Sequence, residues 1–320
     1  MSQIGIHGVI QARPNVYRHM RPSPLLHHPL LSESLGFECH VKHENHNPTG
    51  AFKIRGGLNF MAGFAEAQPG RGIISATRGN HGQSLAMASR LYGVSCTIVV
   101  PMGNNPEKNN AIRSHGAHLI EFGKDFDEAR IHATQLQHEQ GFYYVSPGNE
   151  VPLIHGVGTY ALEIFEVLPN VDGIIVPLGG GSGVCGVLAV AQAINPKVEV
   201  YAVQAENAPC IYLSWKKGEL VETATSVTFA DGLATRVPFE LPFEYLKNRV
   251  TEIVLVSEEE IRRAVLAMWQ CTHNLPEGAG AASLAAAFKL QHRLTGKKVV
   301  LVLSGGNVDV GTLRWVLNPI

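Results

Sequence analysis

The sequence has little that would indicate a secreted, membrane or nucleic-acid-binding protein. Its five cysteines are scattered without a CxxC pair, so neither a disulfide framework nor a zinc site is expected, and a reducing compartment such as the cytoplasm fits. No apolar stretch reaches membrane-spanning length, and the N-terminus lacks the basic patch and apolar run of a signal peptide. With 26 basic and 27 acidic side chains, the net charge of -1 gives no reason to expect a nucleic-acid partner.

The composition that remains is that of a globular protein with a large core. Hydrophobic residues make up 45% of the 320 residues and charged residues 17%, which excludes a disordered chain and allows one large domain or two medium ones. Of the 33 glycines, several occur in clusters, and the positions of these clusters carry more information than their number.

From residue 72 onward, short apolar strands alternate with helices. We expect irregular structure over residues 1–38, which contain four prolines, and a loop-rich segment over residues 218–248. The predicted strands cover residues 37–42, 72–75, 96–100, 118–121, 142–145, 171–177, 198–204, 253–256 and 299–303. This alternation predicts an α/β fold with parallel strands, in which ligands bind at the carboxyl ends of the strands.

One lysine lies in a turn that is suited to holding an amine still. Residues 47–56 read NPTGAFKIRG, so a turn with Pro48 and Gly50 leads through Phe52 into a helix that begins near Lys53. An amine packed beside apolar side chains loses hydration, which lowers its pKa and prepares it for a Schiff base or for proton transfer. Taken alone, the stretch is more typical of a helix-capping turn followed by an ordinary surface lysine.

Two loops follow predicted strands and are suited to binding anions. Residues 77–82 read TRGNHG and lead into a helix, where backbone N–H groups can bind a carboxylate or phosphate, although a capping turn has the same pattern. Residues 179–183 read GGGSG and also precede a helix. The latter run overlaps GxGxxG at residues 181–186, and Glu206 follows about 20 residues later, so this motif alone also permits a dinucleotide.

A third strand end carries Ser304 in the sequence SGGN, where a hydroxyl could face a ring nitrogen or simply cap a helix. Two further acids, Asp231 and Glu277, stand beside small residues at loop and helix junctions. For both acids we expect solvated helix caps.

Taken in order, these stretches resemble the pyridoxal-phosphate-dependent serine/threonine dehydratase family, of the tryptophan-synthase-β fold type (fold type II), which also includes serine racemase. The resemblance runs from Ser23 to Asn307 and rests on PTGAFKIRG, GNHGQ, the glycine run, ADG and SGGN. It implies that Lys53 carries pyridoxal 5'-phosphate as a Schiff base, with the remaining contacts assigned as follows. The ring would contact Phe52, Asn80 and Ser304; the phosphate would bind Gly179, Gly180, Gly181, Ser182 and Gly183; the substrate carboxylate would bind at Thr77, Arg78, Gly79, Asn80 and His81.

The activity implied by the resemblance is dehydration and deamination of L-threonine or L-serine to a 2-oxo acid and ammonia, with Lys53 as the base for the α-proton. The implied architecture is two α/β domains with the cofactor between them. Residues 1–64 and 149–320 would form the large cofactor-binding domain, and residues 65–148 a small domain that closes on the amino-acid substrate. We expect a homodimer.

Three departures from the family pattern modify this expectation. Arg78 replaces the serine that acts as proton donor in racemases, so racemisation should be weak; the arginine could instead favour a bulkier or acidic substrate, such as phenylserine or 3-hydroxyaspartate, or pair with an acid at the domain gap. Gln204 and Cys210 replace carboxylates that bind a cation in some relatives, so no metal is expected, with Glu206 as a weak substitute. With the last residue at Ile320, we expect no regulatory domain and no feedback by isoleucine.

Two rival interpretations come from other classes. An NAD-dependent dehydrogenase would explain the glycine run and Glu206 but leaves the Lys53 turn and SGGN without a role. A non-catalytic ligand-binding module has only the general support that a fold does not fix a function.

Overall fold

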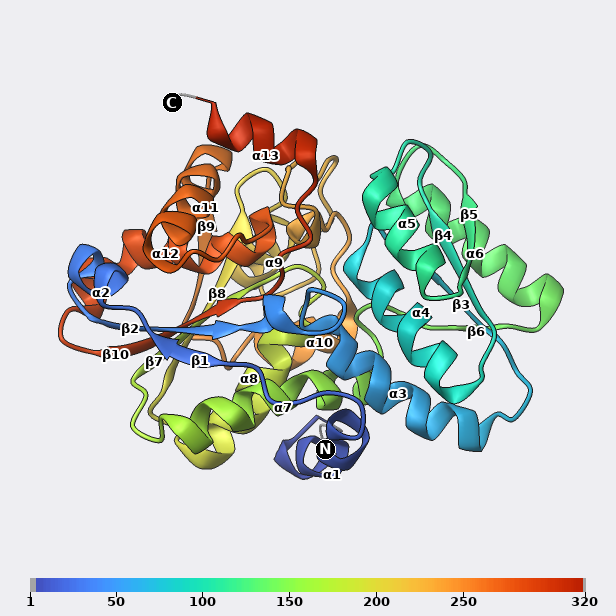
Figure 1. The fold of residues 1–320 in the computed structure, drawn as a ribbon, viewed down its shortest axis with the longest axis horizontal. Helices are drawn as coiled ribbons and strands as arrows, with labels where there is room; N and C mark the ends of the chain where they lie inside the picture. Colours follow the sequence, from blue (N-terminus) through green and yellow to red (C-terminus); the bar gives the residue numbers. More distant parts are fainter. Residues whose placement is uncertain (1–3, 319–320) are drawn as a thin grey trace.

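The computed structural model describes residues 4–318, and in this part of the chain two separate sheets form two bodies that lie side by side (Figure 1). The larger sheet has the order β1-β2-β10-β7-β8-β9, and the smaller one the order β5-β4-β3-β6. All neighbouring strands are parallel except β1, which is antiparallel to β2 at the edge. The strands are β1 Leu25–His27, β2 Glu38–His43, β3 Ile73–Ala76, β4 Cys96–Val100, β5 His118–Glu121, β6 Tyr143–Tyr144, β7 Gly173–Pro177, β8 Glu199–Ala205, β9 Glu252–Val256 and β10 Lys298–Leu303.

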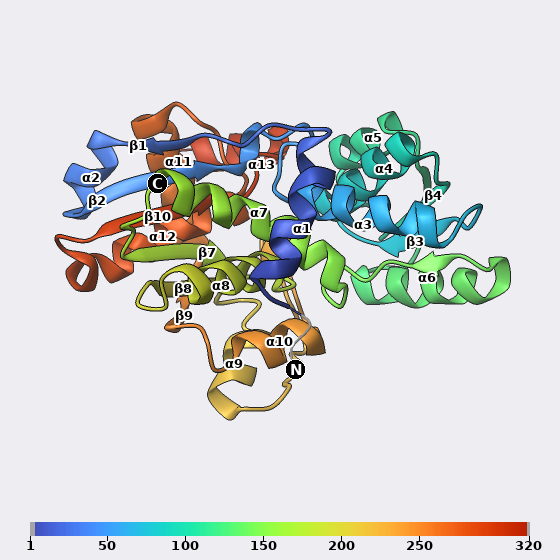
Figure 2. The same cartoon turned by 90° about the horizontal axis from the view of Figure 1, so that it is seen from below.

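Helices cover the faces of both sheets. They are α1 Ile6–Tyr17, α2 Pro29–Leu35, α3 Lys53–Ala67, α4 Asn80–Tyr92, α5 Pro106–Ser114, α6 Phe126–Gln140, α7 Val151–Val167, α8 Ser182–Ile194, α9 Cys210–Lys217, α10 Glu240–Leu246, α11 Glu258–Thr272, α12 Gly278–Leu294 and α13 Val310–Leu317, with 3-10 turns η1 Glu44–His46 and η2 Asp231–Leu233. Helices α7 and α8 lie on one face of the six-stranded sheet, and α11 and α12 on the other (Figures 1 and 2).

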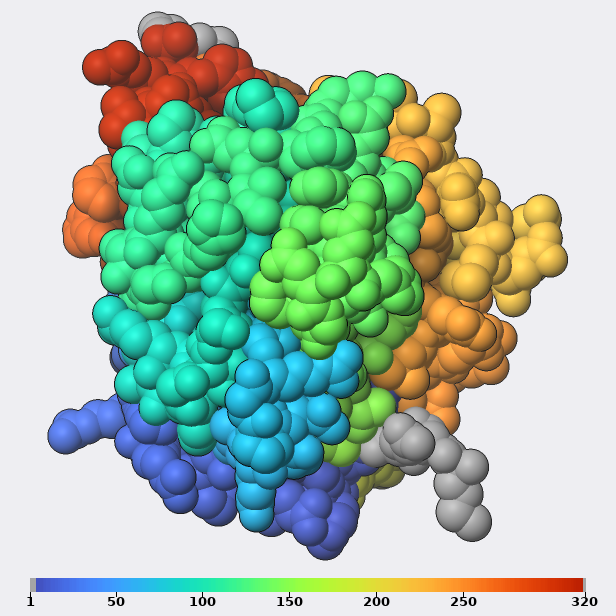
Figure 3. All heavy atoms as spheres, turned by 90° about the vertical axis from the view of Figure 1, so that its right-hand side faces the viewer, coloured from blue at the N-terminus to red at the C-terminus, as the bar shows by residue number. Residues whose placement is uncertain are grey.

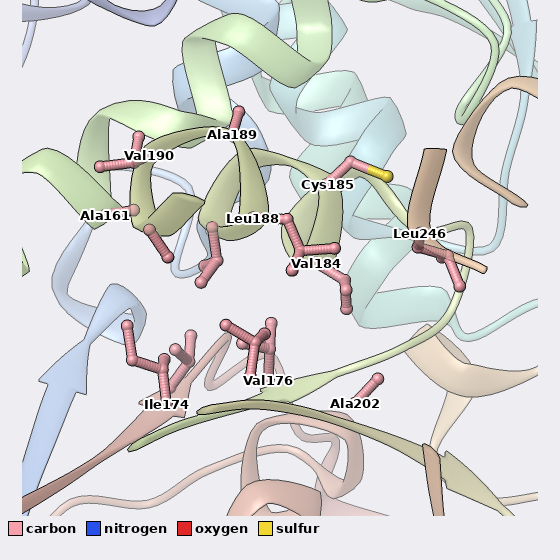
Figure 4. Packing of buried hydrophobic residues seen from close by; sticks show 14 of the residues in the cluster. Ala161, Ile174, Val176, Val184, Cys185, Leu188, Ala189, Val190, Ala202 and Leu246 are labelled. Carbon is pink, nitrogen blue, oxygen red and sulfur yellow. The ribbon is translucent and has the colours of Figure 1, made fainter. Parts of the chain in front are cut away.

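The central strand β7 shows why the sequence forms a strand buried on both faces. Ile174 and Val176 face α8, where they meet Val184 and Leu188 (Figure 4), whereas Ile175 packs in the core on the opposite face. A strand with period-two alternation between two helical layers must be apolar throughout, as strands of parallel sheets usually are. The first of these two cores therefore holds β7 and α8 in a fixed relation, and the loop between them lies at the carboxyl end of the sheet.

The four-stranded sheet lies between α4 and α5 on one face and α6 on the other. Helix α3 joins the two bodies, because it packs on α4 of the smaller one and on α7 of the larger one. The predicted domain limits at residues 64/65 and 148/149 stay a prediction, and the structure adds that the helix ending near the first limit shares its core with both sides.

Most predicted elements are confirmed, and the main error is at the N-terminus. Residues 1–38 were expected to be irregular, yet their described part contains α1, β1 and α2. The prolines misled the prediction, because Pro29 occupies the first turn of α2, where no backbone donor is needed, and Pro14 lies within α1. Helix α1 forms because Val9, Ala12 and Val16 are buried, and the helix packs against α7 and α3 (Figure 2). The α/β fold class is confirmed.

In residues 4–318, no helix combines the length and the apolar character that a membrane crossing requires.

Candidate active site

A cavity of about 1140 Å³ lies between the two bodies at the carboxyl ends of their strands. Its walls come from the strand ends of both sheets, from α6, and from residues 224–239 of the larger body, which run along the edge of the smaller one (Figure 3). The sequence-predicted residues that line this cavity are Phe52, Lys53, Thr77, Arg78, Gly79, Asn80, His81, Gly179, Gly180, Gly181, Ser182, Gly183 and Ser304. Segments far apart in the sequence therefore meet at one place, which is large enough for a cofactor together with a small substrate.

Lys53 is the first residue of α3, and its amine reaches across the cavity to the start of α8. The Nζ atom donates a hydrogen bond to Ser182 Oγ at 2.8 Å and lies 5.1 Å from the centre of the Phe52 ring. Burial lowers the pKa of Lys53 to about 8, since removing water disfavours the charged amine. A substantial neutral fraction is thus present near neutral pH.

The turn before Lys53 is fastened to the end of β10. The Phe52 N–H donates to the Ser304 carbonyl at 3.0 Å, the Gly306 N–H donates to the Gly50 carbonyl at 2.9 Å, and Ala51 forms a bridge with Gly305. These backbone bonds set the position of Lys53 relative to Ser304, which is buried and lines the cavity. The two motifs are more than 240 residues apart in the chain and form one structural unit.

A cluster of buried charged side chains holds the first turn of α3 in place. The Arg55 guanidinium, fully buried, bonds Glu44 at 2.7 Å and Glu163 at 2.6 Å, and Lys42 Nζ bonds the second oxygen of Glu163 at 2.5 Å. The two positive and two negative charges compensate one another, which burial requires. The cluster joins β2, η1, α3 and α7, and thereby fixes the helix that carries Lys53.

The glycine run turns sharply from β7 into α8 and passes close to the neighbouring loop. Gly181, which precedes α8, has a φ of 92°, where a side chain would be strained. A Cβ on Gly179 would lie 1.9 Å from the Gly232 carbonyl oxygen, so only glycine allows this approach. The N-terminus of α8 consequently opens onto the cavity with its N–H groups available to an anion.

The loop from Thr77 to His81 forms the opposite wall. Thr77 Oγ1 accepts a hydrogen bond from the Gly79 N–H at 3.0 Å, and Asn80 is the first residue of α4. His81 is buried and bonds Ser75 Oγ at 3.1 Å. Burial, with a contribution from the nearby Lys53 charge, lowers the pKa of His81 to about 3, so the imidazole is neutral and serves to hold the loop.

The expectation that Glu277 is a solvated helix cap was wrong. Its side chain is only 6% exposed and accepts a hydrogen bond from Asn80 Nδ2 at 2.6 Å. Burial raises the pKa of Glu277, and the Lys108 charge and the Asn80 hydrogen bond oppose that shift. The sequence could not reveal this, because Asn80 and Lys108, the two groups that oppose the shift, lie about 170 to 200 residues earlier in the chain.

Asp231, also expected to be a solvated cap, is one third exposed and pairs with cations across the cavity. Lys108 Nζ on α5 bonds Asp231 Oδ2 at 2.7 Å, and Arg78 Nη1 lies 3.9 Å from Asp231 Oδ1. Arg78 thus approaches an acid at the gap between the two bodies, one of the two roles expected from the sequence. Lys108 is a buried cation that also lines the cavity. No motif in the sequence marks it, so it could not be recognised there.

Three residues considered from the sequence do not reach the cavity. Glu206 is 49% exposed and lies 3.9 Å from Lys289 Nζ, so it does not complete a dinucleotide site. Gln204 accepts the Tyr212 N–H at 2.9 Å and contacts Cys210 Sγ at 3.9 Å. Within residues 4–318, no three His, Cys, Asp or Glu side chains are grouped so that they could hold a metal ion. That a metal plays no part stays a prediction.

The two α/β bodies, with a cavity between them at their strand ends, define an enzyme of fold type II. The chain belongs to the family of pyridoxal-phosphate dependent enzymes, whose model matches residues 16–305.

Comparison with named relatives and with a solved structure supports the same family. The chain is 39% identical over 307 residues to an L-threonine ammonia-lyase of Geobacter sulfurreducens (96% of this chain, 76% of the relative), and 38% identical over 316 residues to an L-threonine ammonia-lyase of Thermotoga maritima (98% and 78%). The solved structure of maize serine racemase superimposes with a TM-score of 0.91 at 28% identity, covering 97% of this chain and 96% of that one. The expected family and cofactor are confirmed, and the dehydrogenase interpretation is excluded.

The residues of the cavity fit pyridoxal phosphate. An amine with a lowered pKa, a helix N-terminus that follows three glycines, and the buried Ser304 hydroxyl all face one space. These are the groups required by an aldehyde, a phosphate and a ring nitrogen, respectively.

Proposed function

We propose that this enzyme dehydrates and deaminates a β-hydroxy amino acid of the L-threonine or L-serine type to a 2-oxo acid and ammonia. The observation that carries the proposal is the Lys53 amine, which faces the cavity and donates to Ser182 at the N-terminus of α8. The names of the two bacterial relatives, both L-threonine ammonia-lyases, support the same substrate class.

Within this proposal, each cavity residue has a defined task toward the cofactor. Lys53 would hold it covalently, the backbone N–H groups of residues 179–183 would bind its phosphate, and Phe52 would pack on the ring. Ser304 would bond the ring nitrogen, and Asn80 the ring oxygen. A neutral hydroxyl such as Ser304 stabilises a positive ring nitrogen less than a carboxylate would, which favours prompt loss of a β-substituent over transamination.

The bound cofactor supplies the electron withdrawal that makes the proton on the substrate α-carbon acidic. Lys53 Nζ would take that proton as a free amine, for which its lowered pKa is suited. Residues 77–81 hold the substrate carboxylate with the N–H groups at the start of α4, and this contact orients the α-proton toward Lys53.

Arg78 distinguishes the proposed activity from racemisation. An arginine stays protonated and cannot exchange a proton on the face opposite Lys53, and here it approaches Asp231. We expect L-serine to be converted to a 2-oxo acid with little D-serine, which chiral chromatography of the residual substrate measures.

A panel of β-hydroxy amino acids, assayed for 2-oxo acid and ammonia, tests the proposal. The panel contains L-threonine, L-serine, phenylserine and 3-hydroxyaspartate, and L-threonine or L-serine should give the highest kcat/KM. Lys53→Ala should lose both turnover and the visible absorption of the bound cofactor, whereas Lys216→Ala, on the exposed side of α9, should retain them. A Lys53→Ala protein that kept absorption and turnover would contradict the assignment.

The domain limits given above, a homodimeric assembly and a cytoplasmic location are part of the same proposal. Light scattering of the purified protein measures the assembly, and a mass of about one chain would contradict the dimer.

A further inference from the structure

Four groups from distant segments form a continuous chain of hydrogen bonds beside the cavity. Asn307 Nδ2 donates to the Thr49 carbonyl oxygen at 2.9 Å and to Asn80 Oδ1 at 2.8 Å. Asn80 Nδ2 in turn donates to Glu277 Oε1 at 2.6 Å. This chain of hydrogen bonds begins in the turn before Lys53 and ends at the start of α12. Of its members, only Asn80 and Glu277 line the cavity.

The direction of this chain is set by a backbone group. A carbonyl oxygen can only accept, so the atom of Asn307 that faces Thr49 must be the amide nitrogen. Its two hydrogens are then used by the Thr49 carbonyl and by Asn80, and the atom of Asn80 that faces Asn307 must be the oxygen. The two ends of an asparagine amide are nearly identical in shape, and here the hydrogen bonds distinguish them.

One hydrogen of the Asn80 amide takes no part in this chain of hydrogen bonds. Its amide nitrogen has two hydrogens, and Glu277 accepts one of them. Within the chain of bonds the second has no acceptor, and Asn80 borders the cavity.

Two glycines provide the space that these hydrogen-bonded side chains need. A Cβ on Gly50 would lie 2.5 Å from Asn307 Oδ1, and Gly50 also has a φ of 66°. A Cβ on Gly305 would lie 2.5 Å from Glu277 Oε1. Asn307 and Glu277 are therefore packed against two positions where any side chain would displace them.

We infer that Asn307 is a positioning residue that, together with Glu277, fixes the orientation of the Asn80 amide so that an N–H, rather than a carbonyl oxygen, faces the ring oxygen of the cofactor. This inference rests on the proposed role of Asn80. An N–H stabilises a negative ring oxygen, whereas a reversed amide would place its own partial negative charge there. Asn307 acts through Asn80, since it does not itself line the cavity.

Two substitutions of Asn307 separate orientation from packing. Asn307→Ala removes the donor, and Asn307→Asp keeps the volume but cannot donate to Thr49 or to Asn80. We expect both to transfer part of the visible absorption of the bound cofactor to the near-ultraviolet band of a protonated ring oxygen, and to lower kcat/KM by about tenfold to a hundredfold. Asn45→Ala is the matched control, because Asn45 lies beside Gly306 and bonds Asn274 without lining the cavity, and it should leave the spectrum unchanged.

A double-variant cycle tests whether Asn307 acts through Asn80. In an Asn80→Ala background, Asn307→Ala should cause no further spectral change and less than a twofold further loss of kcat/KM. Equal losses in the two backgrounds would overturn the inference, as would an unchanged spectrum in Asn307→Asp. Thermal unfolding of each variant without cofactor identifies a variant that fails to fold. If Asn307→Ala fails to fold, the spectrum of the isosteric Asn307→Asp decides whether the inference holds.

The spectral measurement does not depend on turnover. A wild-type protein that shows the predicted spectra but releases no ammonia from any β-hydroxy amino acid would support the inference and contradict the proposed function. An Asn80→Ala protein with an unchanged spectrum would overturn the inference, because Asn80 would then not contact the ring oxygen.

Discussion

Lys53 in the cofactor-free protein should react as a neutral amine at a pH where ordinary lysines are protonated. Burial lowers its pKa to about 8 from the usual 10.5. At pH 7 about 9% of Lys53 amines would be neutral, compared with about 0.03% for an ordinary lysine, which is an advantage of roughly 300-fold. Reactivity should rise about tenfold per pH unit up to about pH 8 and then level off.

Competitive labelling with acetic anhydride, followed by mass analysis of peptides, measures this profile for each lysine of the same sample. Lys216, which is exposed on α9, is the internal reference. If the Lys53 profile ran parallel to that of Lys216, the Lys53 amine would not be desolvated. Burial would then not lower its pKa, and the reasoning would be refuted.

The same shift has a consequence for stability with a definite sign. The amine has a pKa of about 8 when folded and 10.5 when unfolded, so between these values the unfolded chain binds more protons. The stability of the cofactor-free protein should therefore rise from pH 8 to pH 10.5 through this group. Lys53→Met removes the group, and urea unfolding at several pH values should show a correspondingly flatter dependence.

Further predictions concern the surroundings of the site. Arg55→Met leaves the buried Glu44 without its ion-pair partner and Glu163 with Lys42 alone, and should lower the free energy of unfolding by about 3 to 5 kcal/mol, measured by urea denaturation; a loss below about 1 kcal/mol would contradict the compensated-charge argument. Gly50→Ala should reproduce the spectral change of Asn307→Ala, because its Cβ would displace the Asn307 side chain, and a normal spectrum would count against that displacement. With Gln204 and Cys210 in place of carboxylates, activity should be unaffected by a chelator, and restoration of lost activity by magnesium would refute this.

The sequence was sufficient to place the cavity residues that follow predicted strands. Lys53, the Asn80 loop, the Gly179 run and Ser304 all stand where a strand, or the turn after it, leads into the next segment, and parallel topology brings such positions together. Their chemistry is local, because a glycine run or a lysine in a tight turn carries its own signal.

The contributions of Glu277, Lys108 and Asn307 could not be obtained in the same way. Each depends on a partner in another segment: Glu277 meets Asn80, Lys108 meets Asp231, and Asn307 meets Thr49. An acid beside a glycine looks like a solvated cap in any sequence, and only the packed structure shows that it is enclosed. Helix α1 was missed for a related reason, because burial on α7 outweighed the local effect of Pro14.

The position of β10 has a consequence for how the enzyme is made. This strand lies between β2 and β7 in the six-stranded sheet, yet residues 298–303 leave the ribosome after every other strand of that sheet. Until then the two halves of the sheet lack the strand that pairs with both, and the Lys53 turn lacks the backbone groups that fasten it. Cofactor capture should therefore follow the synthesis of β10, and products interrupted before residue 298 should not withdraw the cofactor from the pool that other enzymes share.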